Sequence, residues 1–455
     1  MGGVRRTRLR AASMAVLVVA AGCQWQRVGS DATPDPSVVV PELFDPTGLY
    51  RRMGFLASGP PVSYVGGLRF LATGTPDTTL ALFALSLANS ALSFRRTAEG
   101  FEARYTPEFT LRREGRIITR LVSEERVRVA TREEARRADE SIVFQKILRV
   151  APGMYDAVVS VRDEESGAVG RAEQPVTVPR FGRPALAPLM VVYQADGRGS
   201  PQDAPPLLLN PRATVPFGLD SLQLYLEAYG TPAGARAHVT LFSATGDSVL
   251  AREVDLAGGP ALAWAIIALP PEELPVGEVR AVARVDGLPD TVRLRALVSF
   301  SDQWAITNFD QILSLLRFFG QDRAIGEMRD AAPANRSALW RAFWRATDPN
   351  PLTPQNESLE LYFRRVQEAN VRFREAGEPG WLTERGEVFI GLGEPDEIFD
   401  SSSDLQGPAR IIRWTYLGER LLLDFVDDTG FGRFRLTPTS RAEFQRVLNM
   451  VRSRG

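Results

Sequence analysis

The sequence predicts a multidomain protein with two tandem antiparallel β-sandwiches (Ig-like) followed by a C-terminal α+β domain. Short runs in which apolar and polar residues alternate fill the chain from about residue 61 to residue 300. Such runs, separated by turn residues, are typical of sandwich strands. After Phe300 apolar residues recur at helical spacing. The chain has 455 residues, of which 44% are hydrophobic, so it can form several cores.

The first 22 residues are interpreted as an export signal. Four arginines within the first ten residues precede an apolar stretch from Ala11 to Gly22, directly before Cys23. This stretch has the length of a signal peptide and is too short to span a bilayer. The small residues before Cys23 resemble a bacterial lipobox, in which the cysteine is lipidated after cleavage. The alternative is ordinary cleavage beside an incidental cysteine. The arginines are interpreted as a generic basic region rather than a twin-arginine signal.

Residues 23–60 are predicted to form a lipidated tether, because they are polar and contain many prolines. The lipid would attach the exported chain to a membrane of the bacterial cell envelope. Gln24 follows the cysteine, and lipoprotein sorting rules then favour the outer membrane over the inner one.

Composition excludes several classes of function. The formal net charge is −1, so the chain has no basic field for nucleic acid. A single cysteine allows no internal disulfide. His238 is the only histidine, which disfavours a Ser-His-Asp site and a zinc site. The sequence has no Walker A loop or dinucleotide fingerprint, so we expect no cofactor and no metal.

The two sandwiches are expected at residues 61–182 and 183–300. In the first, alternating runs predict strands at 78–88, 101–111, 116–130 and 154–163. The run at 78–88 is apolar on both faces and predicts a central strand. The same pattern, a turn glycine followed by alternating residues, begins at Gly153 and again at Gly277. Either an ancient duplication or a strand pattern that arose without common ancestry would explain it.

The C-terminal domain is expected at residues 301–455. Helical spacing predicts three helices, then strands, then a closing helix over about 440–452. The strands are expected at VFIGL (388–392), 411–417, 420–426 and 431–436. The first three helices are expected around 312–319, 339–344 and 360–375.

Several segments of this last domain carry a resemblance to a known family. They are Asn356-Glu357, the run from Phe363 to Phe373, Gly380-Trp381-Leu382-Thr383-Glu384-Arg385-Gly386 and the run from Ile390 to Ile398. In this order they closely resemble the GWxTD domain of exported bacterial proteins, from roughly residue 301 to the end of the chain. Glu384 stands where the family name has Asp. The resemblance implies a fold and no established activity.

The motif residues are the candidate binding site. Glycines would turn the chain, Trp381 would offer an apolar face and Thr383 would satisfy a backbone group. Every one of these roles also suits a motif that only supports folding, and no catalytic residue is predicted. The candidates are Gly380, Trp381, Thr383, Glu384, Arg385, Gly386, Gly393, Pro395, Asp396 and Glu397.

Two functions remain open at this point. The first is a non-enzymatic envelope component that presents the C-terminal domain to a protein or an envelope polymer. The alternative is a carboxylate-dependent hydrolase of an envelope glycan or peptide, which needs facing carboxylates in a cleft. Its candidates are Asp396, Glu397 and Asp400, together with Asp424, Asp427 or Asp428.

Overall fold

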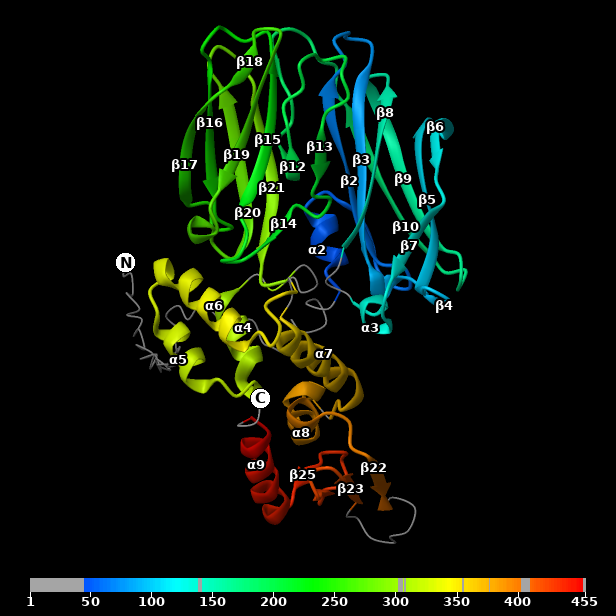
Figure 1. The fold of residues 1–455 in the computed structure, drawn as a ribbon, viewed down its shortest axis with the longest axis vertical. Coiled ribbons are helices and arrows are strands. Elements are labelled where there is room, and N and C mark those ends of the chain that lie inside the picture. The colour runs from blue at the N-terminus through cyan, green and yellow to red at the C-terminus, as the bar shows by residue number, and fades with distance from the viewer. Residues whose placement is uncertain are drawn as a thin grey trace, which may run out of the picture. The chain divides into compact units, whose positions relative to one another are not determined.

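The computed structural model describes residues 45–137, 141–301, 306, 308–353, 356–375, 377–401 and 410–452 (Figure 1). The signal peptide, Cys23 and most of the predicted tether lie outside these residues. The described residues belong to one compact unit. Among them, no helix is both long enough and apolar enough to cross a membrane.

The first sandwich consists of two antiparallel sheets. Sheet I contains β10-β9-β5-β4, and β6 and β7 also pair with β5. Its strands are β4 (Arg95–Thr97), β5 (Gly100–Arg113), β6 (Arg116–Val122), β7 (Glu125–Val129), β9 (Gly153–Asp163) and β10 (Val169–Val178). Sheet II has the order β1-β2-β3-β8. Its strands are β1 (Leu56–Ser58), β2 (Tyr64–Ala72), β3 (Thr79–Ala88) and β8 (Ser141–Val150). A 3-10 turn, η1 (Asn89–Ala91), and α3 (Arg132–Ala135) lie in its connections.

The second sandwich also has two sheets, which confirms the predicted fold class. Sheet III has the order β13-β12-β15-β19-β18, with β11 on β15. Its strands are β11 (Ala185–Leu186), β12 (Met190–Ala195), β13 (Leu207–Leu209), β15 (Leu222–Tyr229), β18 (Ala257–Gly259) and β19 (Leu262–Leu269). Sheet IV has the order β14-β21-β20-β16-β17, and only its β14–β21 pair is parallel among the described pairs. Its strands are β14 (Thr214–Pro216), β16 (Arg236–Phe242), β17 (Ser248–Asp255), β20 (Gly277–Val285) and β21 (Thr291–Ser299).

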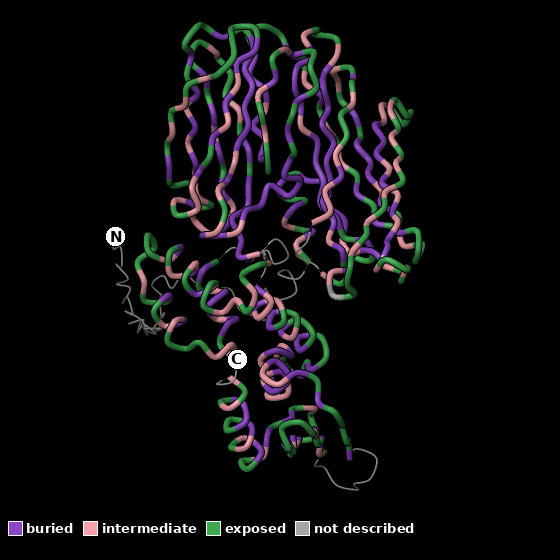
Figure 2. Tube along the Cα trace, viewed as in Figure 1, coloured by how far each residue is buried: buried purple, intermediate pink, exposed green. Residues whose placement is uncertain are grey.

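The four sheets stack face to face in the order I, II, III, IV (Figure 1). The central strands of sheets II and III, β2, β3 and β15, are therefore covered on both faces, and Figure 2 shows the middle of the stack mostly as buried chain. Strand β3 is buried along nearly its whole length, as expected for a central strand. In β15, Leu224 and Leu226 belong to the core shared with sheet IV. Tyr225 and Tyr229 of the same strand belong to the core shared with sheet II.

A buried ion pair lies where sheets II and III meet. The Arg198 guanidinium is 2.7 Å from the Glu227 carboxylate, and both side chains are fully buried. Arg198 also donates to the carbonyl oxygen of Ala72 in β2 at 2.8 Å. The hydroxyl groups of Tyr225 and Tyr229 donate to Glu227. A buried charge is tolerated only with such partners, so this network fixes how the two sheets meet.

The predicted tether is corrected at its C-terminal end. Helix α2 (Thr47–Arg52) and strand β1 belong to the folded part of the chain. Tyr50 and Phe55 are buried, and the Tyr50 hydroxyl lies 2.9 Å from that of Thr214 in β14. The prolines of this segment suggested a solvated linker. Its aromatic residues nevertheless supply enough apolar area to hold it in the core.

The C-terminal region contains helices and one small sheet. The helices are α4 (Phe309–Leu315), α5 (Asp322–Asp330), α6 (Pro333–Thr347), α7 (Glu357–Arg372), α8 (Glu384–Leu392) and α9 (Pro438–Arg452), with 3-10 turns η3 (Leu316–Phe318) and η4 (Gly380–Leu382). Sheet V has the order β22-β23-β24-β25. Its strands are β22 (Glu397–Asp400), β23 (Arg410–Tyr416), β24 (Leu421–Asp427) and β25 (Arg435–Leu436).

The predicted strand VFIGL is wrong, because these residues form the second half of α8. The Thr383 hydroxyl accepts the amide N–H of Gly386 and so caps the helix. Glu384 and Glu387 place negative charge in the first turn, which the helix dipole favours. This local start signal outweighs the strand preference of a short apolar run.

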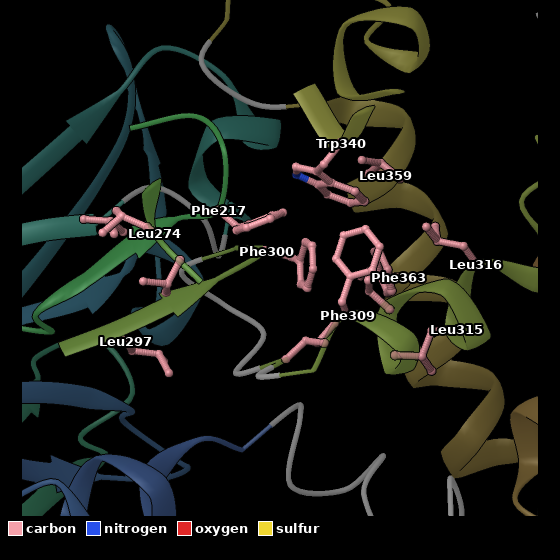
Figure 3. Packing of buried hydrophobic residues seen from close by; sticks show 14 of the residues in the cluster. Phe217, Leu274, Leu297, Phe300, Phe309, Leu315, Leu316, Trp340, Leu359 and Phe363 are labelled. Atoms are coloured by element: carbon pink, nitrogen blue, oxygen red, sulfur yellow. The ribbon is translucent and has the colours of Figure 1, made fainter. Parts of the chain in front are cut away.

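The C-terminal helices share a core with the second sandwich. Phe300 follows β21, and its ring lies 4.6 Å from that of Trp340 in α6 and 5.4 Å from that of Phe217 (Figure 3). Arg341 of α6 also donates to the carbonyl oxygen of Gly218 at 2.7 Å. The last sandwich sheet and the C-terminal helices are therefore packed together by large aromatic residues.

Candidate functional site

Two glycines of the motif allow η4 and α8 to pack closely on α7. A Cβ atom on Gly380 would lie 2.1 Å from the carbonyl oxygen of Ala369 in α7. A Cβ atom on Gly386 would lie 2.0 Å from the carbonyl oxygen of Gly380. Real side chains do not tolerate such distances to backbone atoms. Both positions therefore require glycine for packing, and a ligand is not needed to explain them.

Trp381 is fully buried beside the motif turn. Its ring centroid is 6.5 Å from that of Phe318, and the Arg317 guanidinium lies 5.2 Å from its ring centroid. The indole N–H finds no acceptor among the described residues. The side chain is thus part of the domain core and offers no face to a partner.

Thr383 and Glu384 connect the start of α8 to its surroundings. The Thr383 hydroxyl donates to the carbonyl oxygen of Gly380 at 2.8 Å. The Glu384 carboxylate accepts the amide N–H of Leu436 in β25 and lies 2.8 Å from the guanidinium of Arg441 in α9. Glu384 therefore joins α8 to both of the last elements of the chain.

Arg385 forms an ion pair inside the domain. Its guanidinium is 3.1 Å from the carboxylate of Glu375, and the two side chains are 15% and 0% exposed. The other Glu375 oxygen accepts the amide N–H of Phe434 at 3.1 Å. The Arg385 guanidinium also lies 4.4 Å from the centroid of the Phe434 ring. Burial raises the pKa of the Glu375 carboxyl above its usual range, although Arg385 opposes this shift.

The remaining motif residues lie at the C-terminal end of α8. Gly393 ends the helix at a φ of 89°, and its carbonyl oxygen accepts the Tyr416 hydroxyl at 3.0 Å. Pro395 is buried, whereas Asp396 and Glu397 are exposed. The Asp396 carboxylate accepts the amide N–H of Leu417 at 2.6 Å. Glu397 begins β22, a strand that was not among those predicted from the sequence.

The structure does not bring the carboxylates of the hydrolase hypothesis together. Asp400 lies 3.6 Å from Arg410, and Asp424 lies 2.7 Å from Arg413. The Asp427 carboxylate accepts the backbone N–H groups of a turn, namely those of Thr429, Gly430 and Gly432. The described residues contain no group of three or more His, Cys, Asp or Glu side chains that could hold a metal ion.

The only histidine is part of a surface ion-pair network on sheet IV. His238 Nε2 lies 2.8 Å from the Asp286 carboxylate, and His238 Nδ1 lies 4.0 Å from that of Glu253. The hydrogen bond between His238 Nε2 and Asp286 lowers the pKa of the Asp286 carboxyl. None of these groups lies in the C-terminal domain.

Two cavities in the described part of the chain lie away from the motif. One of about 330 Å³ is lined by α2, the start of sheet II and Gln367. Another of about 440 Å³ lies between the segment 272–276 and the N-terminal ends of α4 and α6. The motif residues line neither of them.

Sequence reasoning missed a surface rather than a cavity. Large hydrophobic side chains are exposed on sheet V, with Phe399 at 58%, Leu417 at 61% and Leu422 at 58%. The sequence contained a signal for this exposed surface. Side chains alternate along β24, so Leu422 points away from the core that holds Leu421 and Leu423.

The chain thus combines stacked β-sheets with an α+β region built around an internal Gly-Trp-Leu-Thr-Glu turn. The family model of the GWxTD domain matches residues 290–420, so a GWxTD domain is present in the C-terminal region. No curated protein matches the sequence.

Two solved structures show a distant likeness to the chain. One is a tetra-tandem repeat in the extending region of a large adhesion protein, at 12% identity and a TM-score of 0.17. The match covers 52% of this chain and 50% of that structure. The other is a pair of titin Ig tandem domains, at 11% identity and a TM-score of 0.14, with coverage of 54% of this chain and 98% of that one. Likeness at this level carries no conclusion about function.

Proposed function

We propose that this protein is a non-enzymatic binding or assembly component of the bacterial cell envelope, which presents its GWxTD domain to a protein or an envelope polymer. The observation that carries the proposal is the exposed apolar surface of sheet V. The motif itself lies inside the domain, so a partner would meet the surface that the motif supports.

The binding surface is the outward side of sheet V. The register pairs Phe399 with Arg413 and places Leu422 opposite Thr415, so these side chains share one face. The opposite face carries Trp414 and Phe425, which are buried in the core. Exposed apolar side chains on one side of a small sheet are typical of an interaction site.

The arrangement of the carboxylates favours binding over hydrolysis. Hydrolysis of a glycan needs two carboxyl groups that flank the scissile bond. Asp400 and Asp424 are each paired with an arginine, and Asp427 is bound to backbone amides. Each of these groups therefore has its own stabilising partner, which is the pattern of structural carboxylates.

We further propose that the chain is exported and anchored by a lipid on Cys23, with the outer membrane as its location. The basic start, the short apolar run and the position of the cysteine support this. Metabolic labelling with a fatty-acid analogue should label the wild type and leave Cys23→Ser unlabelled. Label on Cys23→Ser, or wild type in the cytosol after fractionation, would contradict the anchor.

Crosslinking in cells tests the binding role. A Phe399→Ser, Leu422→Ser pair should lose one specific crosslinked partner at normal protein abundance, because both residues are exposed. The matched control is Ile117→Ser, Val122→Ser, which changes two exposed apolar residues on sheet I. Equal crosslinks in wild type and in the sheet V variant would reject this surface as the binding site. Lower abundance of Trp381→Ala is expected in the same experiment, because this residue holds the core together.

A further inference from the structure

The free edge of sheet V is an exposed strand. β22 is the terminal strand in the order β22-β23-β24-β25, and no other described strand pairs with its outer edge. All its residues are exposed, and Ile398 and Phe399 retain 50% and 58% of their surface. Proteins usually shield such edges, since unpaired backbone groups next to apolar side chains attract another strand. The opposite edge strand, β25, instead contacts α8 and α9.

The edge is also negatively charged. Glu394 is paired with Arg372, and Asp400 lies 3.6 Å from Arg410. Asp396 is bound only to a backbone amide in the described contacts, and Glu397 has no described ion pair. The N-terminal end of β22 therefore carries carboxylates that no described arginine neutralises.

The hydroxyl of the buried Tyr416 donates to the carbonyl oxygen of Gly393, close to this edge. Burial raises the pKa of its hydroxyl, and Arg365 opposes this shift. The carboxylates of Glu394, Glu419 and Asp396 then raise the pKa further.

Charge makes a second copy of the chain a poor occupant of the edge. If two β22 strands paired antiparallel about Ile398, Asp396 would lie opposite the second copy's Asp400. A parallel pair in register would place each carboxylate beside its own counterpart. Like charges directly opposite each other destabilise strand pairs.

We propose that an extended segment of a partner protein adds to β22 as a further strand of sheet V. Ile398 and Phe399 point to opposite faces of sheet V, so one apolar side chain of the segment would pack beside each of them, and a lysine or arginine would lie beside Glu397. Backbone hydrogen bonds supply affinity in this mode of binding, while side chains supply specificity. The acidic residues repel acidic strands and copies of the chain, so they select a basic partner. This inference rests on the proposed binding function and names the partner's chemistry.

A displayed library of random peptides is the probe, panned on the full-length chain. Selected peptides should be extended, with neighbouring apolar residues at their centre and lysine or arginine at one or both ends. Binding of the best peptide should slow hydrogen exchange at the amides of residues 397–400. Glu397→Lys should weaken that peptide by about tenfold or more, because it replaces attraction by repulsion. Glu124→Lys, an exposed carboxylate of the first sandwich, is the matched control and should change binding much less.

Other results would overturn the inference. These are selection of peptides without basic residues, no slowing of exchange at residues 397–400, or equal weakening by both lysine variants. A wild-type dimer in sedimentation that Glu397→Lys dissociates would assign the edge to a second copy. If the Phe399→Ser, Leu422→Ser variant loses its cellular crosslinks but the library yields no peptide, the binding function stands and strand addition is rejected. Peptide selection without any cellular partner would reject the binding function instead.

Discussion

Gly380 shows most directly how single motif residues act. Gly380→Ala would place a methyl group 2.1 Å from the Ala369 carbonyl oxygen, and backbone atoms cannot yield as a flexible side chain can. We expect the free energy of unfolding to fall by about 3 kcal/mol, as for overpacked cores. Urea unfolding followed by tryptophan fluorescence measures this.

The matched control for Gly380 is a glycine with free space. Gly326→Ala lies within α5, and its new Cβ atom would have no neighbour within 4 Å. We expect it to stabilise the chain by about 1 kcal/mol through helix propensity. Similar shifts for both variants would mean that Gly380 is not held by its contact with α7.

Glu375 makes stability depend on pH. Burial raises the pKa of its carboxyl in the folded state above the ordinary 4.5, so the folded state binds the proton more tightly than the unfolded state. Its contribution to stability is therefore present below pH 4.5 and is lost as pH rises through the folded-state pKa. Glu375→Gln should remove this loss, so the difference between the two unfolding profiles should grow as pH rises from 4 toward neutrality.

Exposed Glu443 provides the comparison for Glu375. Its carboxylate pairs with Arg446 on the surface of α9. The Glu443→Gln profile gives the reference for the same substitution at a carboxyl outside the core. If the difference from wild type does not depend on pH for Glu375→Gln, burial does not shift the Glu375 carboxyl.

Residue types and spacing within the motif predicted part of the candidate site. Trp381 as a core residue and Thr383 as a turn-satisfying residue follow from their types and spacing. The Arg385–Glu375 pair does not, because Glu375 lies outside the motif and meets Arg385 only after the chain turns through η4. Contacts made across a turn depend on its three-dimensional path, which residue spacing does not determine.

At the scale of elements, α8 is held by a carboxylate at the position where the family name has aspartate. Glu384 reaches both Leu436 and Arg441. Glu384→Asp shortens the side chain by one methylene, so both contacts cannot be kept. We expect a loss of about 1 to 3 kcal/mol in the free energy of unfolding. Hydrogen exchange should also become faster in β25 and in the first turn of α9.

Glu443→Asp tests whether that effect is specific. It shortens an exposed acidic side chain of α9, where a surface ion pair contributes about 0.5 kcal/mol or less. Unchanged exchange in β25 for Glu384→Asp would show that the interaction does not hold these elements together.

Elements were predicted best where a pattern was long. The strands of the sandwiches and helices α6 and α7 follow from periods of two and of 3.6 residues. The α8 segment was misassigned because five apolar residues fit either element, and Thr383 had not been identified as its cap. β22 was missed because its four residues are all exposed and show no alternation.

At the scale of the molecule, Phe300 couples the second sandwich to the C-terminal helices. Phe300→Ala removes the ring that contacts Phe217, Phe309 and Trp340. We expect a loss of about 3 to 5 kcal/mol in the free energy of unfolding. Transitions followed by tryptophan fluorescence and by far-ultraviolet circular dichroism should coincide in the wild type and separate in this variant.

Phe431→Ala is the control for Phe300, since Phe431 is 79% exposed. It should leave both transitions together and almost unshifted. Coincident transitions in Phe300→Ala would mean that other contacts suffice to couple the two parts.

The sequence indicated two sandwiches but not how they meet. The apolar run at 78–88 showed that one strand has no face in water, which a lone sandwich does not require. Its covering layer is built from residues more than a hundred positions later, so no local pattern identifies it. The Arg198–Glu227 network is likewise formed between distant segments.

The stacking of sheets II and III also sets an order of events during synthesis. Chains emerge and fold from the N-terminus, so sheets I and II can pair before sheet III exists. One apolar face of sheet II then stays bare until the residues of β12, β15 and β19 arrive. A chain that pauses between residue 182 and residue 269 would display this face to its neighbours, so this interval is the one in which a chaperone that binds apolar strands would matter most.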